Sequence, residues 1–237
     1  MEKPFIVCHM LTSLDGKIDG AYMGDPACAS ALAKYGEIRG FYGCSATLYG
    51  TTTMLGSYSA GRVPDTLPDG PAYPMEDYVA ESDVQNYIVS VDPAGALGWE
   101  SKYIEKKGRP RAHVIEVLTG QANPQYLAYL RQFDISYIFA GERDLDCALL
   151  LHKLKTMFGI EKLMVAGGGL MNWSFAQADL LDEVSIVMAP VADGSTTAVS
   201  IFEKADFLPD RKPIAFTLKE VEQIDSGGLW LQYTPCK

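Results

Sequence analysis

Apolar residues along this chain fall into short runs separated by helix-compatible stretches and turn residues. Runs of this length that are bounded by Gly, Pro or Asp are typical of buried strands. We predict strands over residues 5–10, 45–50, 87–93, 112–118, 135–141 and 163–166. Helical patterns occupy residues 29–39, 124–133 and 145–158, and a further helix-compatible stretch follows the last of these strands. In residues 145–158 the apolar positions recur at the spacing of one helix face.

The pattern changes near the C-terminus, where apolar and polar residues alternate. Residues 183–191, 213–221 and 228–233 alternate in this way, with Gly227 and Gly228 as a turn between the last two. Such alternation is typical of half-exposed antiparallel strands. We therefore predict one α/β domain over residues 1–237, with a mixed, mostly parallel sheet, antiparallel C-terminal strands and flanking helices. Residues 57–75 form a long loop whose composition permits either a lid or a surface segment.

Composition narrows the function classes. The chain has 237 residues and a formal net charge of −10, which argues against a basic nucleic-acid-binding face. Its five cysteines are widely spaced without a zinc-ligand pattern, and its three histidines match no metal or triad spacing. The N-terminus shows no signal-peptide pattern, and no apolar run approaches the ~20 residues of a membrane span. We expect a cytoplasmic protein without a metal and without a membrane or nucleic-acid partner.

Two turns carry candidate chemistry. Gly167, Gly168 and Gly169 follow the strand at 163–166 and precede a helix-compatible stretch. Successive glycines and a helix start can aim several N–H groups at one phosphate, although a plain strand-to-helix turn would need the same residues. Asp15 and Gly16 form a second turn, just beyond the strand at 5–10. In open α/β sheets, ligands bind at the carboxyl ends of the strands.

In combination, four segments resemble the reductase domain of the bifunctional riboflavin-biosynthesis enzyme, a member of the dihydrofolate-reductase-like superfamily. They occur in the order of that family, between Phe5 and Phe202. The segments are residues 13–18 (SLDGKI), 50–53 (GTTT), 165–169 (VAGGG) and 180–184 (LLDEV), the last continuing through 189–191 to Gly194. The zinc deaminase half of the bifunctional enzyme has no counterpart in the chain, which contains no His-x-Glu with Pro-Cys-x-x-Cys. The resemblance therefore implies a reductase domain without the deaminase.

The resemblance also implies a three-layer α/β/α fold, NADPH as cofactor, a homodimer, and hydride transfer that opens the ribose of a phosphorylated ribosylaminopyrimidine to a ribityl chain. The implied cofactor-binding residues are Thr12, Gly50, Thr51, Thr52, Thr53, Ser90, Val91, Gly167, Gly168, Gly169 and Leu170. The implied substrate-binding residues are Ser13, Asp15, Lys17 and Asn172. Asp15 and Lys17 are also the candidate catalytic residues, because a carboxylate can hold a hydroxyl or N–H and an ammonium can meet a phosphate. The proton donor could be either of them or a bound water.

Some positions depart from the family pattern. Ala166 stands where many members carry an acidic residue before the glycines, and Arg39 lies out of register in its helix. Asp92 and Pro93 replace the Ser and Arg expected to meet a 2′-phosphate. Two alternatives therefore stay open. The first is a reductase of the same fold that acts on a pterin, an imine or another carbonyl compound. The second is a nucleotide-binding protein without catalysis.

Overall fold

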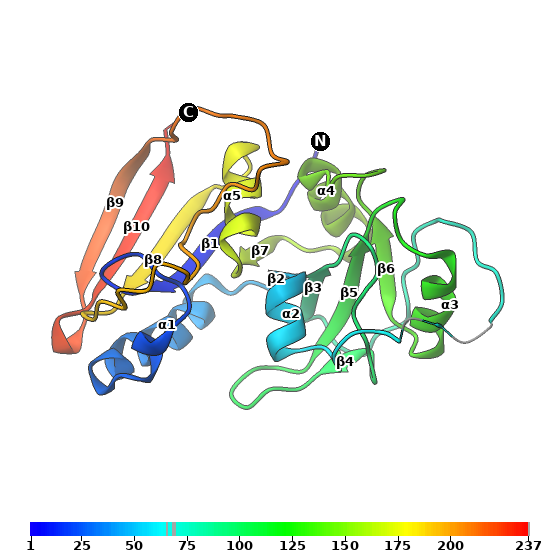
Figure 1. Cartoon of the computed structure of the whole chain (residues 1–237), viewed down its shortest axis with the longest axis horizontal. Coiled ribbons are helices and arrows are strands. Elements are labelled where there is room, and N and C mark those ends of the chain that lie inside the picture. The colour runs from blue at the N-terminus through cyan, green and yellow to red at the C-terminus, as the bar shows by residue number, and fades with distance from the viewer. Residues whose placement is uncertain (65, 68–69, 237) are drawn as a thin grey trace. The chain divides into compact units, whose positions relative to one another are not determined.

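The computed structural model describes residues 1–64, 66–67 and 70–236. The chain divides into two compact units, each of which is described by itself. Unit 1 comprises residues 1–4 and 45–161, and unit 2 comprises residues 5–44 and 162–237. Figure 1 labels the helices and strands of both. That residues 1–237 form one reductase domain stays a prediction.

Unit 1 is built on a mostly parallel sheet. Its strands are β2 (Ala46–Gly50), β3 (Tyr87–Val91), β4 (Tyr103–Ile104), β5 (Ala112–Leu118) and β6 (Ser136–Phe139). Its helices are α2 (Thr51–Ser57), α3 (Pro124–Gln132) and α4 (Cys147–Phe158). Strands β2, β3, β5 and β6 pair in parallel, and β4 pairs antiparallel with β5. All seven residues of β5 are buried, as expected for a strand covered on both faces.

Helices cover both faces of this sheet. On one face, Tyr126 of α3 donates its hydroxyl to Glu116 of β5. Tyr49 of β2 and Glu116 of β5 are both in register with Ser90 of β3, so their side chains lie on the same face of the sheet. On this face Tyr58, which follows α2, stacks on Tyr49. On the other face, Phe158 of α4 packs edge-on against Tyr87 of β3. Unit 1 is therefore three layers deep.

Unit 2 contains the first strand and the antiparallel end of the chain. Its strands are β1 (Phe5–Thr12), β7 (Lys162–Val165), β8 (Glu183–Met188), β9 (Phe216–Gln223) and β10 (Leu229–Pro235). Its α-helices are α1 (Ala29–Tyr42) and α5 (Gly169–Gln177), and its 3-10 helices are η1 (Ala21–Gly24), η2 (Pro26–Cys28) and η3 (Asp225–Gly227). The strand order is β7-β1-β8-β10-β9. Strand β1 pairs in parallel with β7 and β8, whereas β10 pairs antiparallel with β8 and β9.

The two α-helices of unit 2 lie on opposite faces of its sheet. The ring of His9, from β1, stacks on Tyr35 of α1. On the other face, Trp173 of α5 packs against Phe202, which stacks on Phe216 of β9. Unit 2 thus repeats the three-layer arrangement, and the α/β fold with antiparallel C-terminal strands is confirmed.

Local sequence signals explain most element boundaries. Asn123 caps α3 by accepting the Gln125 N–H, and Pro124 occupies the first helical position, where the predicted helix also began. The helix expected from residue 145 begins at Cys147, because Asp146 takes the capping position instead. Strand β4 was not predicted, since two residues carry no readable alternation. No helix in the described residues is both long and apolar enough to cross a membrane.

Candidate functional site

The glycine turn of unit 2 joins β7 to α5, and its glycines differ in what they require. Gly168 has a φ of 62°, in the left-handed region that favours glycine. A Cβ on Gly169 would lie 2.3 Å from the backbone oxygen of Ser200, so this position needs glycine for close approach. Gly168 is also the N-cap of α5, and no side chain of the described residues caps the helix there. The turn therefore has the conformation and the helix-start N–H groups that a phosphate site requires.

The loop after β1 is held by its own polar side chains. The Ser13 hydroxyl donates to Asp15 at 2.6 Å and accepts the Lys17 N–H at 2.9 Å. The carboxylate of Asp15 also accepts the N–H groups of Asp193 at 2.9 Å and Gly194 at 3.0 Å. These hydrogen bonds hold the pKa of Asp15 well below its usual value. Asp15 is therefore ionised at neutral pH, which favours a holding role over proton donation.

Lys17 differs from Asp15 in having an uncommitted charge. Its backbone forms an antiparallel bridge with Ser200. Its side chain is half-buried, and within the described residues its ammonium has no hydrogen-bond or ion-pair partner. An ammonium that is positioned by its backbone but uncommitted at its tip can meet an anionic group of a ligand.

The segment 191–203 joins this loop to the glycine turn, and no part of it was among the predicted site residues. Leu14 donates its N–H to Val191 at 2.8 Å, and Ile18 donates to Val199 at 2.9 Å. Further along, Glu203 donates its N–H to the Gly169 oxygen at 3.1 Å. Because these contacts are made by the backbone, the side-chain pattern carries little signal for them. The available hints were the family resemblance, which continues through 189–191 to Gly194, and the density of Gly, Ser and Thr between residues 194 and 200.

Asn172, a predicted substrate residue, lies on α5 one turn after the glycines. Its side chain is fully buried and donates to the Ile201 oxygen at 2.8 Å. The amide therefore holds the segment 191–203 against the helix, which favours a structural role. Leu170 has a side chain 38% exposed, and Thr12 is buried at the end of β1. Contact of these three residues with substrate or cofactor stays a prediction.

The predicted cofactor residues of unit 1 gather where β2 and β3 end. Gly50 is the N-cap of α2, and residues 51–53 form its first turn. The Thr51 hydroxyl donates to the Val91 oxygen at 2.8 Å, which ties the helix start to the end of β3. Thr52 is the exposed member of the three threonines. Thr51 is therefore occupied inside the unit, and Thr52 is the hydroxyl most accessible to a ligand.

Ser90 belongs instead to a cluster of buried acids that the sequence did not reveal. Its hydroxyl is buried without a hydrogen-bond partner in the described structure, and so is Oε2 of Glu116. Burial raises the pKa of Glu116 well above its ordinary value, and the nearby charge of Asp92 raises it further. A neutral Glu116 can share hydrogen bonds with these neighbours. The side chain of Ser90 therefore faces this cluster, and its predicted cofactor contact stays a prediction.

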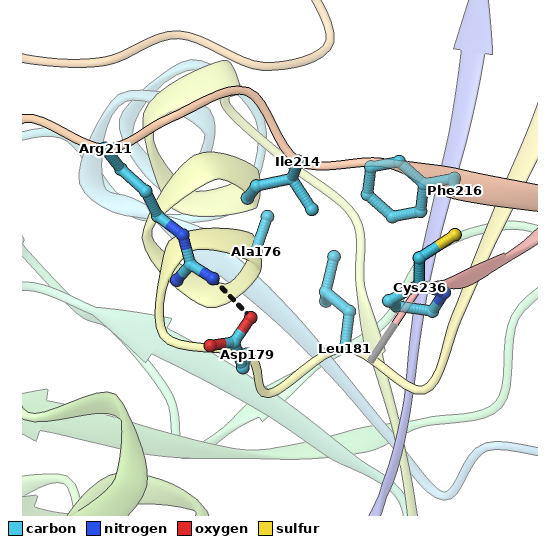
Figure 2. A pocket seen from close by; sticks show the side chains of 8 residues that line it. Ala176, Asp179, Leu181, Arg211, Ile214, Phe216 and Cys236 are labelled. Carbon is cyan, nitrogen blue, oxygen red and sulfur yellow. Dashed lines mark hydrogen bonds and ion pairs between the residues drawn. The ribbon is translucent and has the colours of Figure 1, made fainter.

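A pocket of about 420 Å³ opens elsewhere in unit 2. It is lined mainly by apolar side chains, with the ion pair between Arg211 and Asp179 at its edge (Figure 2). Ala176 and Asp179 place it at the C-terminal end of α5, whereas the glycine turn lies at the N-terminal end. None of the predicted site residues lines this pocket.

The histidines and cysteines form no centre of their own. Burial lowers the pKa of His9 to about 4, and its two ring nitrogens are hydrogen-bonded to Ser185 and to the Tyr35 backbone. His113 has its pKa lowered to about 4, also by burial. All five cysteines are free thiols. In the part of the chain that the structure describes, no three His, Cys, Asp or Glu side chains could hold a metal ion.

The sequence pattern of the RibD C-terminal domain matches residues 4–229. The chain belongs to this family. A relative from Methanothermobacter thermautotrophicus, named 2,5-diamino-6-ribosylamino-4(3H)-pyrimidinone 5′-phosphate reductase, is 26% identical over 205 residues, or 85% of this chain and 84% of the relative. A protein of the same name from Aquifex aeolicus is 31% identical over 83 residues, covering 35% of this chain and 37% of its own length.

Solved structures share the RibD-type fold. A pyrimidine reductase-like protein from Corynebacterium diphtheriae superposes with a TM-score of 0.67 at 15% identity, covering 99% of this chain and 92% of its own. RibD from Acinetobacter baumannii gives a TM-score of 0.64 at 20% identity. The match covers 99% of this chain but 58% of the Acinetobacter protein, so the chain spans little more than half of that relative. These likenesses show the fold of the RibD reductases.

Proposed function

We propose that this chain is an NADPH-dependent oxidoreductase that reduces a ribosylaminopyrimidine 5′-phosphate to its ribityl form. The observation that carries the proposal is the uncapped start of α5 joined, through segment 191–203, to the loop bearing Lys17. This arrangement offers one place for a pyrophosphate and one for a substrate phosphate. The name of the Methanothermobacter relative, similar over most of both chains, supports the substrate class.

NADPH would supply a hydride, and the residues of this chain would bind and orient the two reactants. The residues present fit such a cofactor, because Gly168 adopts a left-handed φ and the first N–H groups of α5 have no side-chain cap among the described residues. We assign the pyrophosphate to residues 167–170 and further cofactor contacts to residues 50–53. We assign a substrate phosphate to Lys17. Asp15 would keep the loop in place through its carboxylate. A carboxylate oxygen with a free lone pair would accept a hydrogen bond from a substrate hydroxyl.

Binding and turnover separate this proposal from its alternatives. NADPH fluorescence should change on titration with the protein, and the candidate pyrimidine phosphate should cause NADPH oxidation. A protein that binds neither NADPH nor NADH would refute the reductase assignment. Cofactor binding without oxidation by the pyrimidine phosphate would refute this substrate and favour a pterin, another imine or carbonyl substrate, or a non-catalytic nucleotide-binding protein.

Two variants test the assigned residues. Gly168→Asp places a carboxylate at the proposed pyrophosphate site and should abolish NADPH binding, whereas Gly36→Asp, on the exposed side of α1, serves as a control. Lys17→Met should raise the KM for the pyrimidine phosphate by about tenfold, consistent with loss of one charge-assisted hydrogen bond, without changing the Kd of NADPH. Equal weakening of both ligands by Lys17→Met would contradict its assignment to the substrate.

We also propose that the chain forms a homodimer through the face of β9 and β10 that points away from α1. On this face Leu231 pairs with Val221 and Ile186, and Tyr233 pairs with Leu218. Leu218 is 49% exposed and Val221 is 52% exposed, so apolar side chains extend across three neighbouring strands. Strand β9 ends the strand order of unit 2, which makes a self-complementary contact with a second copy feasible.

Sedimentation analysis tests the dimer directly. The wild-type chain should sediment as a dimer, and the double variant Leu218→Lys/Val221→Lys should sediment as a monomer. Val79→Lys replaces an apolar side chain of similar exposure in unit 1 and should leave the dimer intact. A monomeric wild-type chain, or a dimer insensitive to the double variant, would contradict this interface. A reducing cytoplasm, proposed as the location, agrees with five free thiols.

A further inference from the structure

Specificity between NADPH and NADH depends on the groups that meet the adenosine ribose. In dinucleotide folds, an acidic residue at the end of a strand holds the ribose 2′-hydroxyl of NADH, whereas an arginine accommodates the 2′-phosphate of NADPH. The adenosine end of the cofactor is expected at the carboxyl end of β3. The residue that follows β3 is Asp92, which by its position would be the acidic reader.

Asp92 is not available to a ribose. Its side chain is 2% exposed. One carboxylate oxygen accepts the N–H groups of Ala96 at 2.5 Å and Leu97 at 2.9 Å. The carboxylate is therefore turned into its own loop, where it fixes the chain from residue 92 to residue 97. Unless this loop opens, no acidic side chain from position 92 can accept a ribose hydroxyl.

Arg62 is brought to the same loop by backbone pairing. Residues 60–63 run antiparallel to residues 96–98, and Arg62 lies directly opposite Leu97. The Ala60 N–H donates to the Gly98 oxygen at 2.8 Å, and the Val63 N–H donates to the Ala96 oxygen at 3.0 Å. Thus the same loop holds the carboxylate inward and aligns an arginine beside it, although Arg62 is thirty positions away in the sequence.

Among the described residues of unit 1, no carboxylate forms an ion pair with Arg62. In the described structure its guanidinium forms no hydrogen bond or ion pair. Burial raises the pKa of Asp92. The N–H groups of Leu97 and Ala96 and the nearby charge of Arg62 partly offset this rise. Two other cations of this unit are paired: Lys102 contacts a carboxylate at 2.5 Å and Lys153 does so at 2.7 Å. Arg62 is exposed, so a ligand phosphate can reach its guanidinium.

We infer that Arg62 is the specificity-determining residue that binds the 2′-phosphate of NADPH. This inference rests on the proposed function, because it requires a nicotinamide cofactor whose adenosine end lies at β3. Arg62 would supply the cation for the 2′-phosphate, since the positions directly after β3 hold Asp92 and Pro93 instead of a basic residue. It also gives the buried Asp92 a positioning role, since its hydrogen bonds fix the loop against which residues 60–63 pair.

Calorimetric titration with adenosine fragments tests the role of Arg62 without any turnover. Arg62→Gln should raise the Kd of adenosine 2′,5′-bisphosphate, and of NADPH, by about 10- to 100-fold, the range expected for one or two charge-assisted hydrogen bonds. The Kd values of adenosine 5′-monophosphate and NADH should change less than about twofold. Arg62→Lys should recover part of the loss, because it restores the charge but not the paired donors.

Arg111→Gln is the matched control. Arg111 lies in unit 1, directly before β5, and is paired with Asp83. This variant should leave all four Kd values unchanged. Equal Kd changes for the ligands with and without the 2′-phosphate, or no change for any ligand, would overturn the role of Arg62. If the wild-type chain binds neither NADPH nor NADH, the proposed function itself fails.

Discussion

Replacement of Gly169 by alanine tests whether segment 191–203 packs closely on the glycine turn. Alanine normally stabilises a helix relative to glycine, so a loss of stability here would report the close packing. The new Cβ would lie 2.3 Å from the Ser200 oxygen and 3.0 Å from Cγ of Glu203. The first of these atoms belongs to the backbone, which cannot rotate away as a flexible side chain could. Segment 191–203 would therefore have to move away from α5.

The magnitude follows from opposing contributions. Overpacking costs about 1–3 kcal/mol, and each of the two hydrogen bonds that hold the segment contributes about 1 kcal/mol. Those bonds join Glu203 to Gly169 and Asn172 to Ile201. Alanine regains up to about 1 kcal/mol of helix propensity. The free energy of unfolding should therefore fall by about 2–4 kcal/mol.

Urea unfolding of Gly169→Ala and Gly36→Ala measures the difference. Gly36 lies within α1, and no atom outside its own helix lies within 4 Å of the position that a Cβ would take there. Its replacement should therefore stabilise the chain by about 0.5–1 kcal/mol. NADPH titration should show weaker binding for Gly169→Ala alone. Equal stabilisation by the two alanines would refute the close packing of segment 191–203 on the turn.

Three further predictions concern ionisable groups. Asp15→Asn should lower kcat by about tenfold and leave the Kd of NADPH within about twofold, because it disturbs the substrate loop; equal losses of both would contradict the holding role. The pKa of Glu116 is raised in the folded state, so the unfolded chain loses its proton first and stability falls as pH rises above the ordinary value of 4.5. Glu116→Gln should therefore stabilise the chain at pH 8 more than at pH 4, whereas Glu105→Gln, an exposed control, should not. His9 has a lowered pKa, so stability should fall by roughly 3 kcal/mol as pH drops from 6.5 to about 4; an NMR titration midpoint of His9 above 6 would contradict its burial as a neutral ring.

The strands and most helices could be predicted because their signals are local. Apolar runs identify β1 and β5, and a capping Asn with Pro marks the start of α3. Strand β9 was placed two or three residues early, since its alternation continues beyond Val221. The long loop at 57–75 was recognised, but not the pairing of Arg62 with Leu97, which joins distant segments. Residues 65 and 68–69 of that loop lie outside the described residues.

The candidate site was predictable where a residue type implies a contact. Glycines indicated the turn before α5, and Lys17 is positioned with an unpaired ammonium in the described structure. Ser90 shows the limit of such reasoning, because its side chain is buried beside Glu116. Segment 191–203 shows another limit: it is held by backbone groups, which any residue except proline can supply.

The two units differ in how the chain supplies them, and this bears on synthesis at the ribosome. Unit 1 is nearly continuous, whereas unit 2 takes residues 5–44 first and residues 162–237 last. Strand β1 pairs Phe5 with Lys162 and Val7 with Glu183, so its partners are the last to be translated. The apolar β1 therefore stays unpaired while more than a hundred further residues leave the ribosome. During that time chaperones can bind it. A circular permutant that begins near residue 45 would place both parts of unit 2 together at the end of the chain and should shorten that exposure.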